Sequence, residues 1–139
     1  MKILFAADGS EFTRRALDYL LTHDWLRAGN AISVFTAVMP VPHRAAAMAG
    51  PALTHQYYED DAEQVLRPIR ERLAGTSVDV EYAHVVGRSA EAIVHKAEAG
   101  RFDLIVMGSH GHGALAGVVM GSVATRVLAS CKVPVLLIR

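Results

Sequence analysis

The sequence predicts an α/β fold in which helices cover both faces of a mostly parallel β-sheet. Short apolar runs alternate five times with segments whose apolar residues recur at helical spacing, and such alternation is typical of parallel sheets. The chain has 139 residues, of which 52% are apolar and 20% charged, as in ordinary globular domains. We find no internal repeat and no low-complexity linker, so we expect one domain over residues 1–139.

The N-terminal segment predicts a strand, a helix and a second strand. Residues 3–7 form an apolar run that suits a buried strand. The Asp-Gly-Ser sequence that follows predicts a tight turn in which Ser10 caps a helix. We expect that helix to end near residues 28–30, and residues 31–38 to form a strand closed by the prolines of residues 39–42. The apolar face of the helix comprises Phe12, Ala16, Leu17, Leu20 and Leu21.

The middle of the chain predicts a loop, a helix and a third strand. Residues 43–53 are rich in alanine and contain Gly-Pro, and we expect a mobile loop there. Residues 53–73 predict a helix that Pro68 should kink or split. Residues 78–86 alternate apolar and polar side chains and predict a strand at the sheet edge. The inner face of the helix comprises Val65, Leu66, Ile69 and Leu73.

The C-terminal part predicts two helices and two strands around a glycine-rich stretch. Ser89 is expected to cap a helix that ends at Gly100, and residues 103–107 predict a buried strand. After the glycines, residues 122–131 predict a helix and residues 133–138 the fifth strand. The inward residues of the two helices are expected to be Ile93, Val94, Ala97, Val123, Val127 and Leu128.

Charge and cysteine content exclude several classes of protein. The chain has 14 basic and 14 acidic residues, so nothing global indicates a nucleic-acid or anionic-membrane partner. No signal peptide and no stretch long enough to span a bilayer is visible, and we expect a cytoplasmic protein. The single cysteine, Cys131, lies among apolar neighbours and is interpreted as a buried small hydrophobe.

The segment GSHGHGALAGVVMGS, residues 108–122, predicts a phosphate cradle. Five of its fifteen residues are glycine, it runs into a helix start, and no acidic residue follows Asp103. Glycines let backbone N–H groups approach phosphate oxygens, and a helix N-terminus favours an anion. A flexible turn is the simpler alternative, but the number and spacing of the glycines favour the cradle.

Two common nucleotide motifs fit this segment poorly. A P-loop requires a lysine after its last glycine, and the segment has none before Lys132. Residues 111–116 match the dinucleotide pattern GxGxxA. That pattern needs an acidic residue about 20 positions further on to bind the ribose, and the sequence offers none.

The glycine spacing resembles that of the nucleotide-binding universal stress proteins. Their motif, G-x2-G-x9-G-[S/T], is carried here by Gly108, Gly111, Gly121 and Ser122. Residues 3–10, 103–108 and 133–137 resemble the opening, fourth and closing strands of that family. The resemblance implies a three-layer α/β/α fold, Rossmann-like and adenine nucleotide alpha hydrolase-like, with a five-stranded parallel sheet in the order 3-2-1-4-5.

The resemblance also implies an ATP site at the reversal of strand order. The adenosine would lie beside Ala6, Ala7, Asp8, Ala37 and Val38. The ribose and first phosphates would lie beside Met107, Gly108, His110 and Gly111, and the outer phosphates beside Gly121, Ser122 and Val123. Asp8 can equally stabilise the Asp-Gly turn, and Ser122 can also cap the last helix. Ala7 and Ala124 replace bulkier or polar residues of some relatives.

Together these features predict a stress-response module that binds ATP, or AMP or ADP, and acts through nucleotide-dependent conformation or partner binding. Mg²⁺ would enter only with the triphosphate, because carboxylates are scarce. His110 and His112 have no neighbouring metal ligands in the sequence, so we expect no metal site. We find no hydrolytic machinery and expect slow ATP hydrolysis at most.

Two other functions remain open on the sequence alone. One is a homodimeric interaction protein that binds no nucleotide, and the other is an adenylyl-transferring enzyme. An apolar edge strand over residues Val133–Ile138 usually needs a cover, and members of the family commonly pair it with its twofold mate. We therefore expect a homodimer through that strand, with no nucleic-acid or membrane partner.

Overall fold

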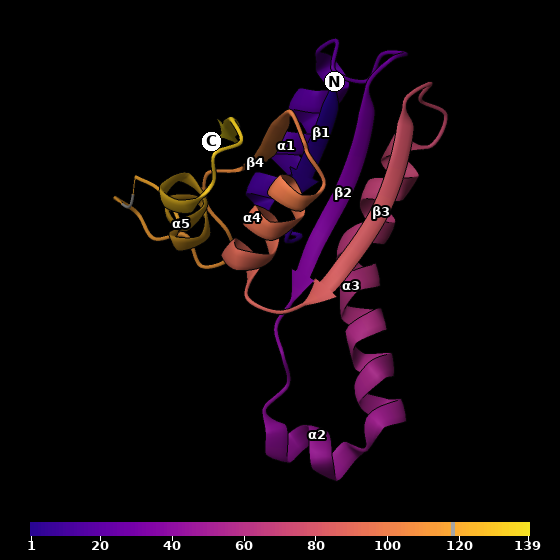
Figure 1. Cartoon of the computed structure of the whole chain (residues 1–139), viewed down its shortest axis with the longest axis vertical. Helices are drawn as coiled ribbons and strands as arrows, with labels where there is room; N and C mark the ends of the chain where they lie inside the picture. Colours follow the sequence, from indigo (N-terminus) through magenta and orange to yellow (C-terminus); the bar gives the residue numbers. More distant parts are fainter. Residues whose placement is uncertain (118) are drawn as a thin grey trace.

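The protein is a five-stranded parallel sheet flanked by helices (Figure 1). The structure, a computed structural model, describes residues 1–117 and 119–139. The strand order is β3-β2-β1-β4-β5 and all four pairings are parallel, which confirms the expected fold class and order. The strands are β1 (Lys2–Ala6), β2 (Ala31–Val38), β3 (Asp79–Val86), β4 (Leu104–Gly108) and β5 (Val135–Ile138). The helices are α1 (Glu11–Thr22), α2 (His43–Ala49), α3 (Pro51–Leu73), α4 (Ser89–Ala99) and α5 (Ser122–Ser130).

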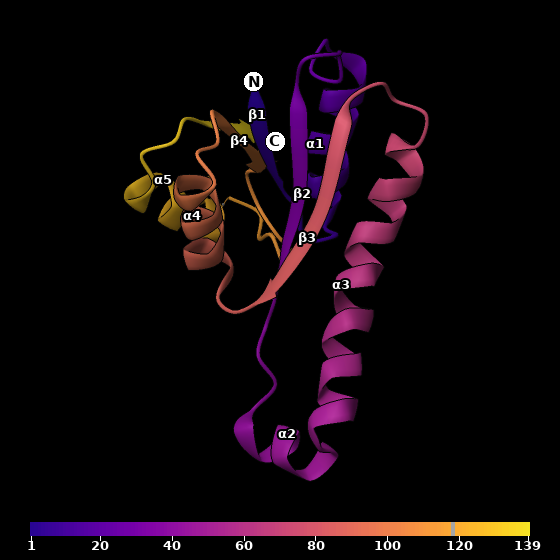
Figure 2. The same ribbon diagram turned by 45° about the vertical axis from the view of Figure 1, so that its right-hand side comes forward.

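Helices pack on both faces of the sheet, as Figure 2 shows. In β1, Ile3 and Phe5 point to the face covered by α1 and α3, whereas Leu4 and Ala6 point to the face covered by α4 and α5. Because successive side chains of a strand alternate between faces, a strand buried on both sides is mostly apolar, and residues 3–6 are all apolar and buried. None of the described helices is long and apolar enough to cross a membrane.

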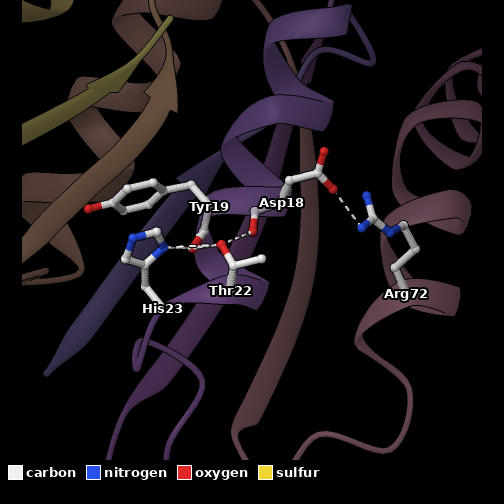
Figure 3. Close-up of polar contacts among 5 residues, drawn as sticks. All are labelled: Asp18, Tyr19, Thr22, His23 and Arg72. Atoms are coloured by element: carbon white, nitrogen blue, oxygen red, sulfur yellow. Dashed lines mark hydrogen bonds and ion pairs between the residues drawn. The ribbon is translucent and has the colours of Figure 1, made fainter.

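Helix α1 begins as predicted but ends earlier. The Ser10 hydroxyl accepts a hydrogen bond from the backbone N–H of Thr13 at 3.3 Å, which confirms the N-cap. The helix ends at Thr22 rather than near residues 28–30. Thr22 Oγ1 donates to the Asp18 carbonyl at 2.8 Å, and the His23 ring bonds the Tyr19 carbonyl at 2.9 Å (Figure 3). These side chains satisfy carbonyls of the last turn, so the chain can leave the helix at His23.

An ion pair joins α1 to α3 on the same face of the sheet. The Asp18 carboxylate accepts a hydrogen bond from Arg72 Nη2 at 2.6 Å (Figure 3). Beneath this pair, the apolar faces of both helices meet the strands, with Leu17 and Leu20 from α1 and Leu66 and Ile69 from α3 all buried. The predicted inner faces of these two helices therefore lie largely as expected.

The expected loop over residues 43–53 is instead helical. Helix α2 covers His43–Ala49, and α3 begins at Pro51. Alanine and methionine favour a helix, Gly50 makes the corner with a φ of +84°, and proline suits the first helical position. The sequence interpretation gave the Gly-Pro pair too much weight. Figures 1 and 2 both show α2 and the start of α3 extending beyond the sheet.

Several finer expectations are also corrected. Helix α3 continues through Pro68, which is exposed, so the carbonyl that proline leaves unpaired can bond water. Helices α4 and α5 have Arg88 and Gly121 at the N-cap, with no capping side chain in either described cap, so Ser89 and Ser122 lie one residue inside. Leu128 of α5 is 44% exposed rather than inward, and half-buried Cys131 packs at the margin of the core.

Candidate functional site

A cavity of about 370 Å³ lies at the carboxyl ends of β1 and β4. These strands are neighbours in the sheet, with Ala6 paired to Met107, but the chain leaves them in opposite directions along the strand order. Connections on the two sides then diverge and leave a crevice, which is where open α/β sheets bind ligands. The volume is in the range typical of small-molecule sites.

Eleven of the twelve residues named from the sequence line this cavity. They are Ala6, Ala7, Asp8, Ala37, Met107, Gly108, His110, Gly111, Gly121, Ser122 and Val123. The exception is Val38, whose side chain is buried in the core between the sheet and α1 and α3. Ala37 lines the cavity, and the next residue of a strand points to the opposite face, so Val38 cannot share that position.

The β1–α1 turn forms one wall of the crevice and is organised by Asp8. Its Oδ1 accepts hydrogen bonds from the backbone N–H of Ser10 at 2.9 Å and from the Thr13 hydroxyl at 2.7 Å. The Thr13 hydroxyl in turn accepts from the Asp8 backbone N–H at 3.0 Å. Asp8 therefore does stabilise the turn, as the simpler sequence interpretation held. Its second carboxylate oxygen faces Gly111 across the crevice.

The glycine stretch forms the opposite wall, and three of its five glycines stand at close contacts. A Cβ at Gly108 would lie 2.6 Å from Phe12 Cβ, and a Cβ at Gly111 would lie 2.7 Å from Asp8 Oδ2. A Cβ at Gly121 would lie 3.1 Å from the Cα of His110. Each distance is shorter than ordinary van der Waals contact, so a side chain at any of the three would push the walls apart.

The N-terminus of α5 opens into the cavity without a capping side chain. Gly121 occupies the N-cap and its carbonyl accepts from the N–H of Thr125 at 3.0 Å. The N–H groups of the first helical turn have no partner within a helix. Those of Ser122 and Val123 belong to residues that line the cavity. They present positive partial charge to whatever the cavity holds.

Two histidines of the glycine stretch lie in the cavity wall. The His110 ring is 4.9 Å from the Phe12 ring, and its Nδ1 lies 2.9 Å from the Ser109 hydroxyl. The His112 ring reaches across the crevice, with Nε2 2.7 Å from the carbonyl oxygen of Asp8. A carbonyl oxygen only accepts hydrogen bonds, so Nε2 carries the proton.

The cavity wall contains little permanent charge. Among its described lining residues Asp8 is the one carboxylate, and none is lysine or arginine. Backbone N–H groups and the dipole of α5 would therefore carry the binding of an anion. In the described part of the chain no group of three histidine, cysteine or acidic residues could hold a metal ion.

This geometry agrees with a comparison against known families. The family model described as the universal stress protein family matches residues 1–139. The chain belongs to the universal stress protein family. A universal stress protein of Thermus aquaticus, encoded in the QAH/OAS sulfhydrylase 3′ region, is 34% identical over 138 residues, which cover 99% of this chain and 97% of that relative. Universal stress protein Slr1230 of Synechocystis is 33% identical over 99% of this chain, but the match spans only 42% of the relative's own length.

Two solved structures illustrate the shared fold. The hypothetical protein MJ0577 has a TM-score of 0.84 at 28% identity, with 99% of this chain and 94% of that chain covered. UspA of Lactobacillus plantarum has a TM-score of 0.82 at 21% identity, with 100% and 97% covered.

Three other solved members of the family are described with adenine nucleotides. A complex with cAMP has a TM-score of 0.73 at 24% identity, covering 100% of this chain and 97% of that chain. An Arabidopsis thaliana protein with AMP bound has a TM-score of 0.71 at 15% identity, with 99% of this chain and 90% of that chain covered. An Archaeoglobus fulgidus protein in complex with dAMP has a TM-score of 0.68 at 22% identity, with 100% of this chain and 98% of that chain covered.

Several residues that line the cavity of this universal stress protein were missed from the sequence. They are Thr13, Phe35, Ser89, Ile93, His112, Gly113, Ala114, Leu115, Met120 and Ala124 as a wall residue. Phe35 could have been found, because it lies two residues before Ala37 and so on the same face of β2. His112 was considered only as a metal ligand, and nothing in the local sequence indicates its contact with Asp8.

Proposed function

We propose that this universal stress protein binds an adenine nucleotide in the crevice between β1 and β4. The observation that carries the proposal is the uncapped N-terminus of α5, which opens into a cavity whose opposite wall presents the Asp8 carboxylate. One end of the cavity thus suits phosphate and the other suits hydroxyl groups that donate to a carboxylate. Relatives of this fold are described with cAMP, AMP and dAMP, which makes adenine nucleotides the first ligands to test.

Each part of the nucleotide has a matching part of the wall. The base would pack beside Ala37 and Phe35, which offer apolar surface at the end of β2. The ribose hydroxyls would donate to the free side of Asp8. The phosphates would accept from backbone N–H groups of Gly111 and of residues 121–123. ATP would bring Mg²⁺ with it, because the described wall has a single carboxylate and no basic side chain.

The proposed role is a cytoplasmic switch or sensor rather than an efficient catalyst. Nucleotide occupancy would change the glycine stretch and the surface around it, and so the choice of partner. We assign the site binding and, at most, slow ATP turnover. The balance of 14 basic and 14 acidic residues favours protein partners over nucleic acid.

Thermal unfolding with added nucleotides tests the proposal. A ligand that binds only the folded state adds about 2.7 kcal/mol to the free energy of unfolding at a hundred times its Kd. We expect ATP, AMP or cAMP at millimolar concentration to raise Tm, and GTP to leave it unchanged. Acid extraction of freshly purified protein should also release an adenine nucleotide. No shift with any adenine nucleotide, together with an empty extract, would refute the proposal in favour of an interaction protein that binds no nucleotide.

We also propose a homodimer through β5. All four residues of β5 are apolar and only half-buried, whereas the other sheet edge, β3, carries the exposed acidic residues Asp79 and Glu81. Charged residues discourage strand pairing and an apolar edge invites it. A twofold pairing of β5 strands would cover the edge.

The test of the homodimer is the oligomeric state of Val135→Pro. The carbonyls of Pro134 and Ile138 face β4, so the N–H of Val135 points to the free edge, since alternate residues of a strand face the same neighbour. Proline removes that donor without breaking the β4–β5 ladder. We expect sedimentation velocity to show a dimer for the natural sequence and a monomer for Val135→Pro, which should still unfold cooperatively but at a lower Tm, because the partner no longer stabilises the folded state. A monomeric natural sequence would contradict the proposal.

A further inference from the structure

His112 and Asp8 join the two walls of the crevice although 104 positions separate them in the chain. His112 Nε2 donates to the backbone carbonyl of Asp8 at 2.7 Å, a short hydrogen bond for this pair of atoms. The donor belongs to the start of the glycine stretch after β4, and the acceptor belongs to the turn after β1. The bond therefore runs from one side of the cavity to the other.

Two glycines flank this contact. Gly9 follows Asp8 with a φ of +77°, which favours glycine in the turn, and a Cβ there would make ordinary van der Waals contacts with His112 Nε2 at 4.0 Å and Val65 Cγ2 at 3.4 Å. Gly111 precedes His112 and lies against Asp8 Oδ2, where a Cβ would be only 2.7 Å away. The glycine stretch thus meets Asp8 at two successive residues, one on the carboxylate and one on the carbonyl.

The acceptor side of the contact is rigid. Asp8 Oδ1 is bonded to the Ser10 N–H and to the Thr13 hydroxyl at the start of α1. Ser10 and Thr13 are both buried, so the turn cannot move without disturbing the first turn of the helix. The glycine stretch, in contrast, has exposed residues from His112 to Gly117. The His112 hydrogen bond consequently anchors the exposed glycine stretch to the β1–α1 turn.

We propose that His112 is a positioning residue that holds the start of the glycine stretch against the β1–α1 turn and thereby sets how long a bound nucleotide is retained. The inference rests on the proposed nucleotide site. A ligand held between the walls leaves when they separate, and the His112 bond opposes that separation. Loss of one net hydrogen bond at an exposed position corresponds to about a three- to tenfold faster dissociation. The association rate depends on encounter with the open state and changes less.

The experiment compares His112→Ala with His112→Gln. The glutamine amide can reach the Asp8 carbonyl with an N–H donor, whereas alanine cannot. Surface plasmon resonance with unlabelled ATP and AMP over immobilised full-length protein gives both rate constants. We expect about three- to tenfold faster dissociation for His112→Ala and recovery of most of the effect in His112→Gln. His95→Ala, at an exposed position of α4, is the matched control and should behave as the natural sequence does.

Hydrogen exchange in the absence of nucleotide tests the positioning role separately. Amides of residues 108–117 should exchange faster in His112→Ala and return toward the natural rate in His112→Gln, with Tm unchanged in both. Unchanged exchange, or unchanged dissociation of a nucleotide that the natural protein does bind, would overturn the role of His112 and leave the proposed function standing. A natural protein that binds no adenine nucleotide would overturn both.

Discussion

The backbone N–H of Gly121 donates a hydrogen bond to the carbonyl oxygen of Ser109, 2.8 Å away. This bond closes the glycine stretch at its base and brings the start of α5 beside the end of β4. The φ of Gly121 is −72°, a value that any residue adopts, so glycine is needed here for space and not for backbone conformation. A Cβ would meet His110 Cα at 3.1 Å and the Ser109 oxygen at 3.3 Å.

Replacement of Gly121 by valine should therefore weaken nucleotide binding. The side chain would push the N-terminus of α5 away from residues 109–111 and spoil the arrangement of N–H donors. Loss of one hydrogen bond to a charged group costs about 1.5–3 kcal/mol, so we expect affinity for ATP to fall about tenfold or more by isothermal titration calorimetry. Gly87→Val is the control, because a Cβ at Gly87 meets nothing within 4 Å. Equal affinity of Gly121→Val and the natural protein would remove α5 from the proposed site.

Gly108→Ala should destabilise the fold itself. The new methyl group would lie 2.6 Å from Phe12 Cβ and 3.0 Å from the Phe12 carbonyl carbon, and neither atom belongs to a flexible side-chain end. We expect the free energy of unfolding in urea to fall by about 1–3 kcal/mol. Gly87→Ala should change it by less than about 0.5 kcal/mol. A Gly108→Ala protein as stable as Gly87→Ala would show that α1 can shift freely on β4.

The caps of the helices differ in a way that stability measurements can detect. The Ser10 hydroxyl accepts from the N–H of Thr13, whereas Ser122 lies inside α5 and caps nothing. We expect Ser10→Ala to lower the free energy of unfolding by about 1 kcal/mol, and Ser122→Ala to change it by less than about half as much. If the two variants lost equal stability, Ser122 would be the cap that the sequence suggested.

The pair formed by Glu63 and Arg70 predicts a pH-dependent contribution to stability. Arg70 Nη1 and Nη2 each donate to one carboxylate oxygen of Glu63 at 3.0 Å. These hydrogen bonds, with the positive charge of the guanidinium, hold the pKa of Glu63 below its usual value of 4.5. A lowered pKa in the folded state gives stability above pH 4.5 that is lost as pH falls through the lowered value.

The Glu63 side chain is 40% exposed, so solvent screens the pair and we expect about 0.2–1 kcal/mol at pH 7. Urea unfolding of Glu63→Gln should show that difference at pH 7, and the difference should shrink as pH falls below 4.5 and the natural carboxylate takes up its proton. A difference that persists unchanged at pH 3 would mean that packing, and not charge, makes Glu63 favourable.

Much of the fold could be predicted because burial in the core determines the spacing of apolar residues along each strand and helix. A strand buried on both faces is mostly apolar, and β2 begins and ends at the predicted residues, Ala31 and Val38, although Ser33 and Thr36 within it are polar and buried. The order of the strands could not be read from periodicity and came from the resemblance to a family. The segment 43–53 was predicted wrongly because its helix is not part of the core: none of the seven residues of α2, all of them described, is buried.

The candidate site could also be predicted only in part. Glycine spacing located one wall of the cavity, where a Cβ at any of three glycines would lie closer to its neighbours than ordinary van der Waals contact. Local sequence could not indicate the bond between His112 and Asp8, since it depends on the register of β1 against β4 and on the path of the chain after each strand. Val38, in contrast, was misplaced although the local sequence contained the information. Strict alternation along β2 puts Val38 on the face opposite Ala37 and would have excluded it.

The crevice is assembled from the beginning and the end of the chain. Asp8 is made first, and its partner across the cavity follows 104 residues later. A polypeptide that has been synthesised only as far as β4 contains Asp8 but not the glycine stretch. It therefore has one wall of the crevice and lacks the other. A molecule bound between the two walls would stabilise only chains in which both walls have folded, through mass action on the folded state. Retention of that molecule would therefore report that both walls are in place.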